Sequence, residues 1–231
     1  MASEWDLKGA NGADGIDGRS GPTGPSGTNG LNADCSWFDD TRGQPGTNGS
    51  RGVDGQDGTD GQEGKSGGTL VLTVSTFNGG IQFNAVGGDG GKGAIGGDGG
   101  QGGQGGAGGS GSGCDPGGDG GIGGDGADGG DGGTGGPGGR GGIVYLYYQA
   151  NFNMGPVSHD ISGGAGGTGG AGGLAGLPGA GGAGGDGDDG LLWSDEDGEN
   201  GSNGITAGAN GISKNTGAPG PVGEFHFESI V

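Results

Sequence analysis

Glycine occupies every third position along most of this chain, and long stretches carry two glycines in each triplet. The phase is unbroken from Gly87 to Gly111 and resumes in the same register from Gly117 to Gly141. An extended left-handed helix with three residues per turn has three rows of side chains, so one glycine per triplet leaves one row bare. A bare row lets another backbone approach closely. Two glycines per triplet leave two bare rows, which suits a segment with neighbours on more than one side.

The composition excludes an ordinary globular core. Of 231 residues, 79 are glycine and only 26% are hydrophobic. So little apolar surface cannot offset the conformational entropy lost on ordering the chain, and glycine loses the most backbone entropy of any residue. Low hydrophobicity and a net charge of -20 are also typical of disorder. A flexible linker needs no glycine phase, however, so the strict period favours an ordered structure.

A collagen triple helix is the other interpretation of glycine at every third position, and the segments 9–30 and 43–67 would suit it. The chain has only 9 prolines, well below the collagen norm, and a second bare row has no use around a shared axis. We therefore predict a polyglycine II (polyproline II-type) helix bundle in more than two layers, with a small antiparallel β-sheet and essentially no α-helix. Backbone amides bonded between neighbouring helices replace a hydrophobic core.

We expect one elongated domain over residues 1–231, with the sheet at its edge or end. Its parts are single-glycine segments at 9–67 with an insert at 31–42, a β-hairpin at 69–86, a double-glycine bundle at 87–141, a strand at 143–152, a second double-glycine bundle at 163–190, an insert with weak repeats at 191–223 and a C-terminal strand at 225–231. An unbroken helix over 87–141 would span roughly 170 Å at about 3.1 Å per residue, so turns are expected. We place them at Ala94-Ile95, Ser110–Pro116, Ala127-Asp128 and Leu174–Pro178.

Cys35 and Cys114 are the two cysteines, each in an irregular insert. A disulfide between them would constrain the unfolded chain, which is the interpretation we favour, whereas two free thiols would fit a reducing compartment.

The acidic residues of the double-glycine triplets are interpreted as a solvated face, so Asp125→Ala should do little. Calcium is the alternative, because Gly123–Asp131 resembles part of a calcium-binding nonapeptide repeat and Asp195–Glu199 the start of an EF-hand loop. Both patterns are incomplete. We expect no cofactor, with calcium ligands, if any, among Asp125, Asp128, Asp195 and Asp197.

No pattern of catalytic residues is apparent, and we expect no enzyme activity. With 8 basic against 28 acidic residues, nucleic acid is not an expected partner. The sequence has no apolar stretch that would insert into a membrane and no visible signal peptide.

The inserts contain aromatic residues beside carboxylates. Trp37 and Phe38 precede Asp39-Asp40, and Trp193 precedes Asp195 and Asp197. Loops held by a scaffold commonly carry binding residues, so they are candidates for recognition. The alternative is that they close the ends of the bundle by packing on glycine backbone.

The triplets at Gly9–Gly30 and Gly163–Gly173 resemble two known groups of polyglycine II bundles. One is the springtail (snow flea) antifreeze proteins, and the other is the glycine-rich tip adhesins of phage tail fibres, whose loops contact receptors. The resemblance covers about two thirds of the chain and implies a bundle architecture. It implies an extracellular or virion-surface location.

The leading functional hypothesis is a non-enzymatic structural or surface protein, a rigid unit of a fibre, coat or adhesin that self-associates or binds a surface receptor. The C-terminal strand, with Phe225, Phe227 and Val231, could pair with the sheet of a neighbouring copy and build a filament. The alternative is ice binding, for which the flattest candidate face would carry Ala165, Thr168 and Ala171, with Ala180 and Ala183.

Overall fold

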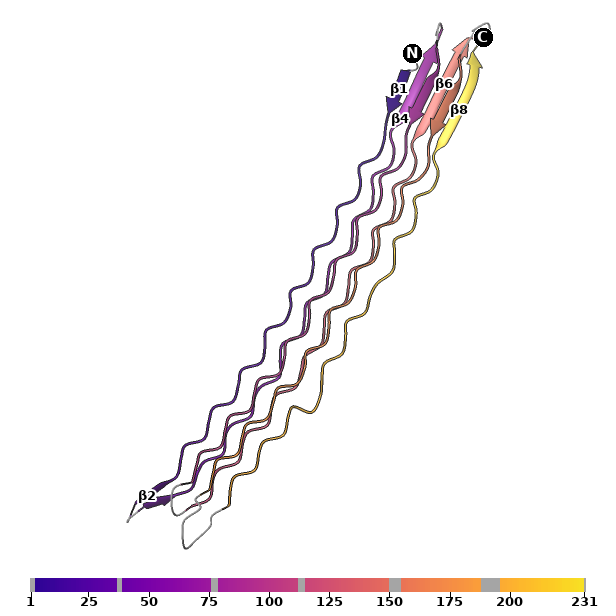
Figure 1. Cartoon of the computed structure of the whole chain (residues 1–231). Coiled ribbons are helices and arrows are strands. Elements are labelled where there is room, and N and C mark those ends of the chain that lie inside the picture. The colour runs from indigo at the N-terminus through magenta and orange to yellow at the C-terminus, as the bar shows by residue number, and fades with distance from the viewer. Residues whose placement is uncertain are drawn as a thin grey trace.

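The computed structural model describes residues 3–36, 39–75, 79–111, 115–149, 155–187 and 196–230. Within these ranges the chain runs back and forth along one rod (Figure 1). The extended parts are segment 1 (3–32), segment 2 (43–74), segment 3 (81–111), segment 4 (117–149), segment 5 (157–187) and segment 6 (196–230). The described residues contain no α-helix, as the glycine content predicted.

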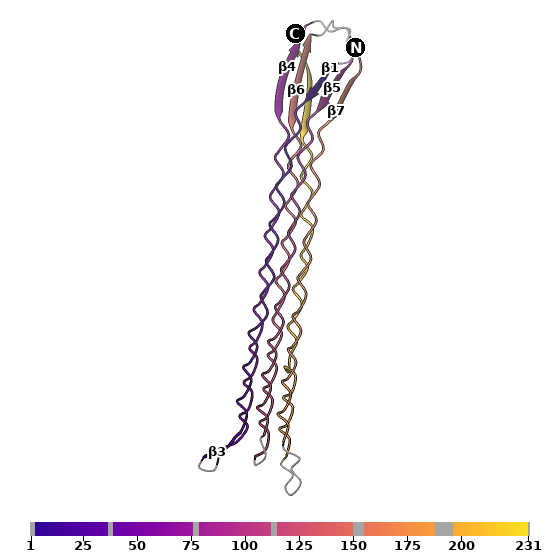
Figure 2. The same ribbon diagram turned by 60° about the vertical axis from the view of Figure 1, so that its left-hand side comes forward.

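The segments form two layers. Segments 1, 3 and 5 run in one direction and lie side by side, and segments 2, 4 and 6 run in the other direction and form the second layer (Figure 2). Segments that follow each other in the chain therefore lie in different layers. The expectation of more than two layers is wrong, because three segments per layer already give the double-glycine segments their neighbours.

Strands lie at one end of the rod. In the first layer, β1 (Ser3–Asp6), β5 (Ile81–Asn84) and β7 (Val157–Asp160) form a parallel sheet. In the second layer, β4 (Thr69–Val74), β6 (Ile143–Gln149) and β8 (Glu224–Ile230) form another. The opposite end carries the short antiparallel pair of β2 (Asp34–Ser36) and β3 (Asp39–Thr41).

The prediction of an antiparallel sheet with a hairpin at 69–86 is therefore wrong. β4 and β5 are neighbours in sequence, but the connection between them crosses from one layer to the other. Gly79 in this connection has a φ of 147°, which glycine adopts without steric cost. Each strand continues the direction of its segment, so strands within one layer are parallel.

A small apolar core fills the space between the two three-stranded sheets. Ile81 and Phe83 from β5 and Val144 and Leu146 from β6 are almost completely buried. The ring of Phe225 lies 6.1 Å from that of Phe83 between centroids.

Along the rest of the rod, backbone hydrogen bonds repeat every three residues and replace a side-chain core. Within the first layer, the Gly87 N–H donates to the Ser162 carbonyl oxygen at 2.9 Å, and the Gly88 N–H crosses the layers to Lys65 at 2.8 Å. Segments 3 and 4, which carry two glycines per triplet, are the middle members of their layers. The single-glycine segments 1, 2 and 6 lie at the edges, as the bare rows predicted. Segment 5 also lies at an edge although it carries two glycines per triplet, so the number of bare rows alone does not fix the position.

Three of the four predicted turns are wrong, because segments 3, 4 and 5 run straight through Ala94, Ala127 and Leu174–Pro178. Both alanines are buried in a glycine row. Their N–H groups donate at 3.0 Å to Thr59 and Gly100, against 2.8 Å for most neighbouring bonds. The neighbouring segments accommodate the methyl group at these positions by lying slightly farther apart.

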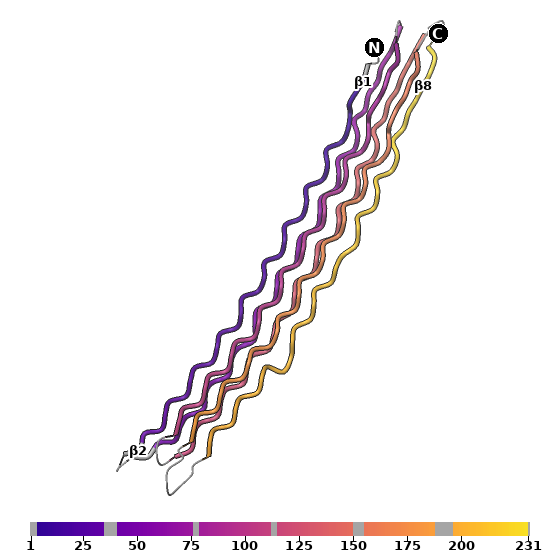
Figure 3. Tube along the Cα trace, viewed as in Figure 1, coloured from indigo at the N-terminus to yellow at the C-terminus, as the bar shows by residue number. Residues whose placement is uncertain are grey.

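Segment 6 contains a one-residue bulge that compensates for two larger residues in segment 5. Gly204 donates to Gly179 and Gly208 to Gly176, so four residues of segment 6 span three residues of segment 5. Ala175 and Pro178, which replace glycine in segment 5, lie beside this bulge. Figure 3 shows it as a kink in the yellow trace. Two irregularities far apart in the sequence thus fit each other in space.

Candidate functional site

Polar side chains on the two broad faces accept the backbone N–H groups that no neighbouring carbonyl can reach. In many of the double-glycine triplets, a side-chain oxygen of the preceding segment in the same layer accepts the N–H of the third residue. The Asn11 Oδ1 accepts the Asp89 N–H at 3.0 Å, and the Asp89 Oδ1 accepts the Ala165 N–H at 2.8 Å. We call these residues the acceptor ladders: Asn11, Asp14, Asp17, Ser20, Asn29, Asn32, Asp89 and Asp98 in the first layer, and Asn48, Asp54, Asp57, Asp60, Asp119, Asp125, Asp128 and Asp131 in the second.

These hydrogen bonds perturb the carboxylates of the second layer. The N–H of Thr206, with a smaller effect from that of Ile205, lowers the pKa of Asp125 below its ordinary value. The Lys214 ammonium, at 2.7 Å, and then the Ile212 N–H lower the pKa of Asp131. The face is acidic, but its carboxylates are parts of the fold. The interpretation of these residues as a merely solvated face is wrong for the ladder members.

Replacing Asp125 by alanine is therefore expected to lower the thermal midpoint, contrary to the sequence-based expectation. The Asp125 Oδ1 accepts two N–H groups, from Ile205 at 2.8 Å and Thr206 at 2.9 Å, where segment 6 bulges. Asp119→Ala, which removes the acceptor of one N–H at 2.9 Å, should have a smaller effect in differential scanning calorimetry.

Asp125→Asn is the matched control, because the amide keeps an oxygen at the accepting position. It should melt close to the unchanged protein at neutral pH. Equal losses for the alanine and asparagine variants would show that the charge of Asp125, rather than its acceptor atom, matters.

The proposed calcium ligands are engaged in hydrogen bonds where the structure describes them. The Asp128 Oδ1 accepts the Ala209 N–H, and the Asp197 Oδ1 accepts the Gly187 N–H, both at 2.7 Å. Within the described ranges, no three His, Cys, Asp or Glu side chains lie close enough to hold a metal ion. Asp195 lies outside those ranges.

The residues expected on an ice-binding face form one exposed row along segment 5. Ala165, Thr168 and Ala171 are all exposed, and the row continues through Leu174, Leu177, Ala180 and Ala183. Hydrogen bonds across the layer place Asp89 beside Ala165 and Asp98 beside Leu174. The adjoining row is therefore charged at intervals.

The remaining candidates of the inserts lie outside the described residues: Trp37, Phe38, Cys114 and Trp193. Only the backbone of Cys35 is described, in β2. The disulfide and the aromatic binding residues remain predictions.

The C-terminal strand, expected to pair with a neighbouring copy, is part of the molecule's own sheet. β8 pairs with β6 over its whole length. The Phe225 ring stacks on His159 with centroids 4.1 Å apart, and Phe227 stacks on Tyr148 at 4.5 Å. Val231 lies outside the described residues. The structure thus gives β8 a partner within its own chain.

The acceptor ladders and the role of the Lys214 ammonium group were not predicted from the sequence. Lys214 stands at a glycine position of segment 6, where its N–H donates to Gly170 at 3.0 Å while its ammonium reaches Asp131. Asn and Asp occur frequently at the third position of the Gly-X-Y triplets, and this pattern could have indicated the acceptor ladders.

Comparisons with known proteins give little. No protein-family model and no curated protein sequence matches this chain. Among solved structures, the nine polyproline type II helical bundle springtail antifreeze protein from Granisotoma rainieri matches with 26% identity, covering 88% of this chain and 93% of that chain, with a TM-score of 0.11. At that TM-score the similarity supports no conclusion about fold or function. In the part of the chain that the structure describes, no helix is long and apolar enough to cross a bilayer.

Proposed function

We propose that the extended segments are polyglycine II helices and that the whole is a non-enzymatic rod. Support comes from the three-residue period of the hydrogen bonds and from glycine at every third position. Amide hydrogen exchange tests the architecture. We expect protection of glycine N–H groups in segments 3 and 4, such as Gly88 and Gly139, comparable with that of β6. Rapid exchange of these glycines beside a protected β6 would refute it.

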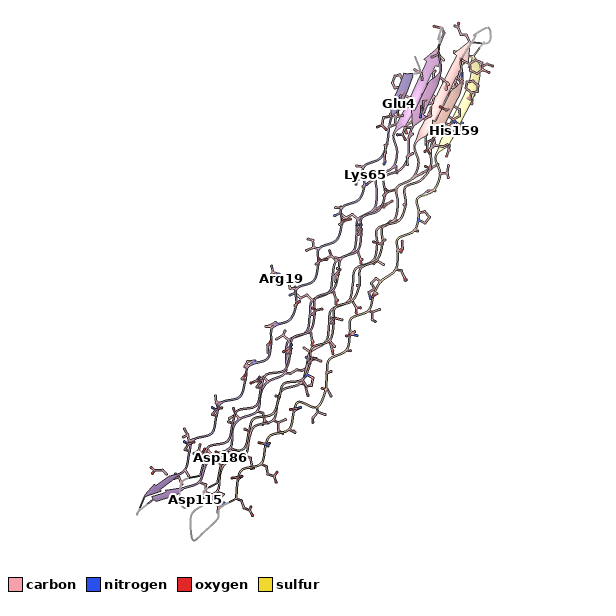
Figure 4. The ribbon with its side chains drawn as sticks, in the orientation of Figure 1. Glu4, Arg19, Lys65, Asp115, His159 and Asp186 are labelled. Atoms are coloured by element: carbon pink, nitrogen blue, oxygen red, sulfur yellow. The ribbon has the colours of Figure 1, made fainter. Side chains whose placement is uncertain are left out.

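The rod would present its irregular connections for binding to a surface receptor, outside the cell or on a virion. The observation that carries this proposal is the separation of the two ends. Both chain termini lie at the end with the three-stranded sheets. The described residues that flank the three inserts, namely β2, Asp115 and Asp186, lie at the opposite end (Figures 1 and 4). A rod anchored near its termini would hold these inserts far from the anchor. Two of them contain Trp37, Phe38 and Trp193.

Removal of these aromatic side chains tests the binding proposal. Trp37→Ser, Phe38→Ser and Trp193→Ser are combined in one variant, and labelled protein is applied to glycan arrays and to intact bacterial cells. We expect the unchanged protein to bind a subset of surfaces and the variant to lose that binding while keeping its thermal transition. Phe227→Ser, at the other end of the rod, is the control. Binding that survives in the triple variant would place recognition elsewhere.

Ice binding is the second candidate, favoured by the uncharged exposed row from Ala165 to Ala183 on segment 5. Because Asp89 and Asp98 adjoin this row, the regular surface would be only one row wide. Thermal hysteresis distinguishes the candidates. Ice shaping that disappears in Thr168→Lys would support ice binding, and the absence of any freezing-point gap would eliminate it.

A further inference from the structure

The strand β4 is an edge of its sheet and is chemically unlike the other edges. In the sheet order β4-β6-β8, no described strand pairs with the outer side of β4. Its sequence, TLVLTV, contains no ionisable residue and no proline. Val71 is 62% exposed and points away from the core. Such an uncharged, β-branched edge is a ready template for pairing with another strand.

The other edges of the two large sheets all carry ionisable side chains. β8 contains Glu224, His226 and Glu228. β1 contains Glu4 and Asp6, and β7 contains His159 and Asp160; Figure 4 shows Glu4 and His159 at this end of the rod. Charged side chains are a common protection of sheet edges, and like charges placed opposite each other across a strand pair are destabilising. β4 therefore stands alone among these edges in lacking this protection.

We infer that β4 pairs antiparallel with β4 of a second copy, giving a two-fold symmetric dimer with a continuous six-stranded sheet. An isologous pair of this kind closes on itself. Because the two strands run in opposite directions, the two bundles extend away from each other. The dimer is a rod of almost twice the length of one chain, and the irregular connections lie at both of its ends.

Side-by-side association of parallel copies is disfavoured by the edges of the bundle. Segments 1 and 2 carry side chains at the edge positions where segments 3 and 4 have glycine, and Arg19 and Lys65 project there (Figure 4). At the other edge, oxygens of segment 6 accept N–H groups of segment 5, for example Asn200 from Gly184 at 2.9 Å. Each copy also has a net charge of -20. Alignment along the whole rod would bring these charges within a Debye length, about 8 Å at physiological ionic strength.

The faces of β4 restrict the register of the dimer. Leu70 and Leu72 pack against the core cluster, so the pairing must keep them on the inner face. A register centred on Val71 meets this condition and brings the two Val71 side chains together on the outer face. In each copy Tyr145 of β6 pairs with Val71, so an apolar stripe would cross the two-fold axis.

Mass and length measured together test the inference. In reducing buffer, light scattering should show twice the 21.3 kDa of one chain at high concentration. The mass should fall on dilution, because five residue pairs, from 69 to 73 in each copy, bury less area than a standard interface. Small-angle scattering should give almost twice the monomer length. A chain that remains monomeric at millimolar concentration, or a dimer of unchanged length, would overturn the inference.

Substitutions at the edge identify the strand involved. Val71→Lys should abolish the dimer by placing two like charges opposite each other at the axis. Independently, Thr73→Lys should weaken it by putting a charge on the pairing edge. Both variants should keep an unchanged circular dichroism spectrum. Ile95→Lys, at a 53% exposed position on the bundle, is the control and should leave the dimer intact. A dimer lost in Phe227→Lys but kept in both β4 variants would instead assign association to β8.

Oxidation of Val71→Cys tests the register. Peptide mapping should find a disulfide that joins the two copies through position 71. The control is Val53→Cys on segment 2, where Val53 is 52% exposed, and its disulfide should form more slowly. Equal rates at the two positions would contradict the proposed axis.

Discussion

Gly103→Ala is expected to lower the free energy of unfolding by about 2–3 kcal/mol, the upper part of the range for overpacking. Gly103 is buried in segment 3. A Cβ there would lie less than 3.0 Å from the carbonyl oxygen of Pro25 in segment 1. That oxygen belongs to the backbone, so it cannot move aside without disturbing hydrogen bonds on both sides of it. The smaller entropy of the unfolded alanine variant offsets only part of this cost, about 0.4–1 kcal/mol.

The neighbouring residue supplies the control. Gln104 is exposed on the same segment, and Gln104→Ala should change the free energy of unfolding by no more than about 0.5 kcal/mol. Urea denaturation of the two variants compares a position in a bare glycine row with the adjacent residue, which belongs to a row that carries side chains. Similar losses in both would mean that the rows are assigned wrongly. Ala94 and Ala127 do not contradict the prediction, because the hydrogen bonds that their own N–H groups donate are already lengthened to 3.0 Å.

Acidification is expected to destabilise the rod steeply as the pH falls below about 4. The pKa of Asp54 is lowered first by the N–H of Asp128 and then by Arg51. The hydroxyl and then the N–H of Thr134 lower the pKa of Asp60. The pKa values of the Asp125 and Asp131 carboxyl groups are also lowered from the ordinary value of 3.8. A pKa that is lower in the folded chain stabilises the fold above the unfolded value, and this stabilisation is lost as the pH falls through the folded value.

Thermal melts from about pH 6 to about pH 3 would measure this loss. Acidification also removes negative charge from a chain of net charge -20, which by itself would relieve repulsion and stabilise the rod. The hydrogen bonds decide the sign, since they are the largest causes of the lowered pKa values. High salt screens repulsion but leaves short hydrogen bonds largely intact, so the acid transition should persist in it. A midpoint that rises on acidification would show that repulsion dominates instead.

Much of the architecture could be predicted because glycine spacing is local information. A bare row fixes which side of a segment a neighbour can approach. Two bare rows allowed segments 3 and 4 to take the middle places, but segment 5, which also has two, lies at an edge. The strand-forming runs, such as IVYLYYQ in β6, were equally clear. The direction of the sheets was missed, because the turn at Gly79 gives no sign that it crosses between layers.

The acceptor ladders were missed for a related reason. An aspartate such as Asp125 looks like a solvated side chain until the N–H groups of Ile205 and Thr206, eighty residues later, are placed beside it. The one-residue bulge of segment 6 and the alanine and proline of segment 5 likewise have meaning only together.

The sequence by itself determined that this chain is held together by closely approaching backbones, because no other use of a phased glycine row satisfies so many amide groups with so few apolar side chains. Only the tertiary structure decided which segments meet, that consecutive segments alternate between two layers, and which edge strand stays unpaired and uncharged. The physical reason is that a bare glycine row accepts any neighbour of the right spacing. The choice among neighbours is made by turns, bulges and side-chain acceptors whose partners lie far away in the chain.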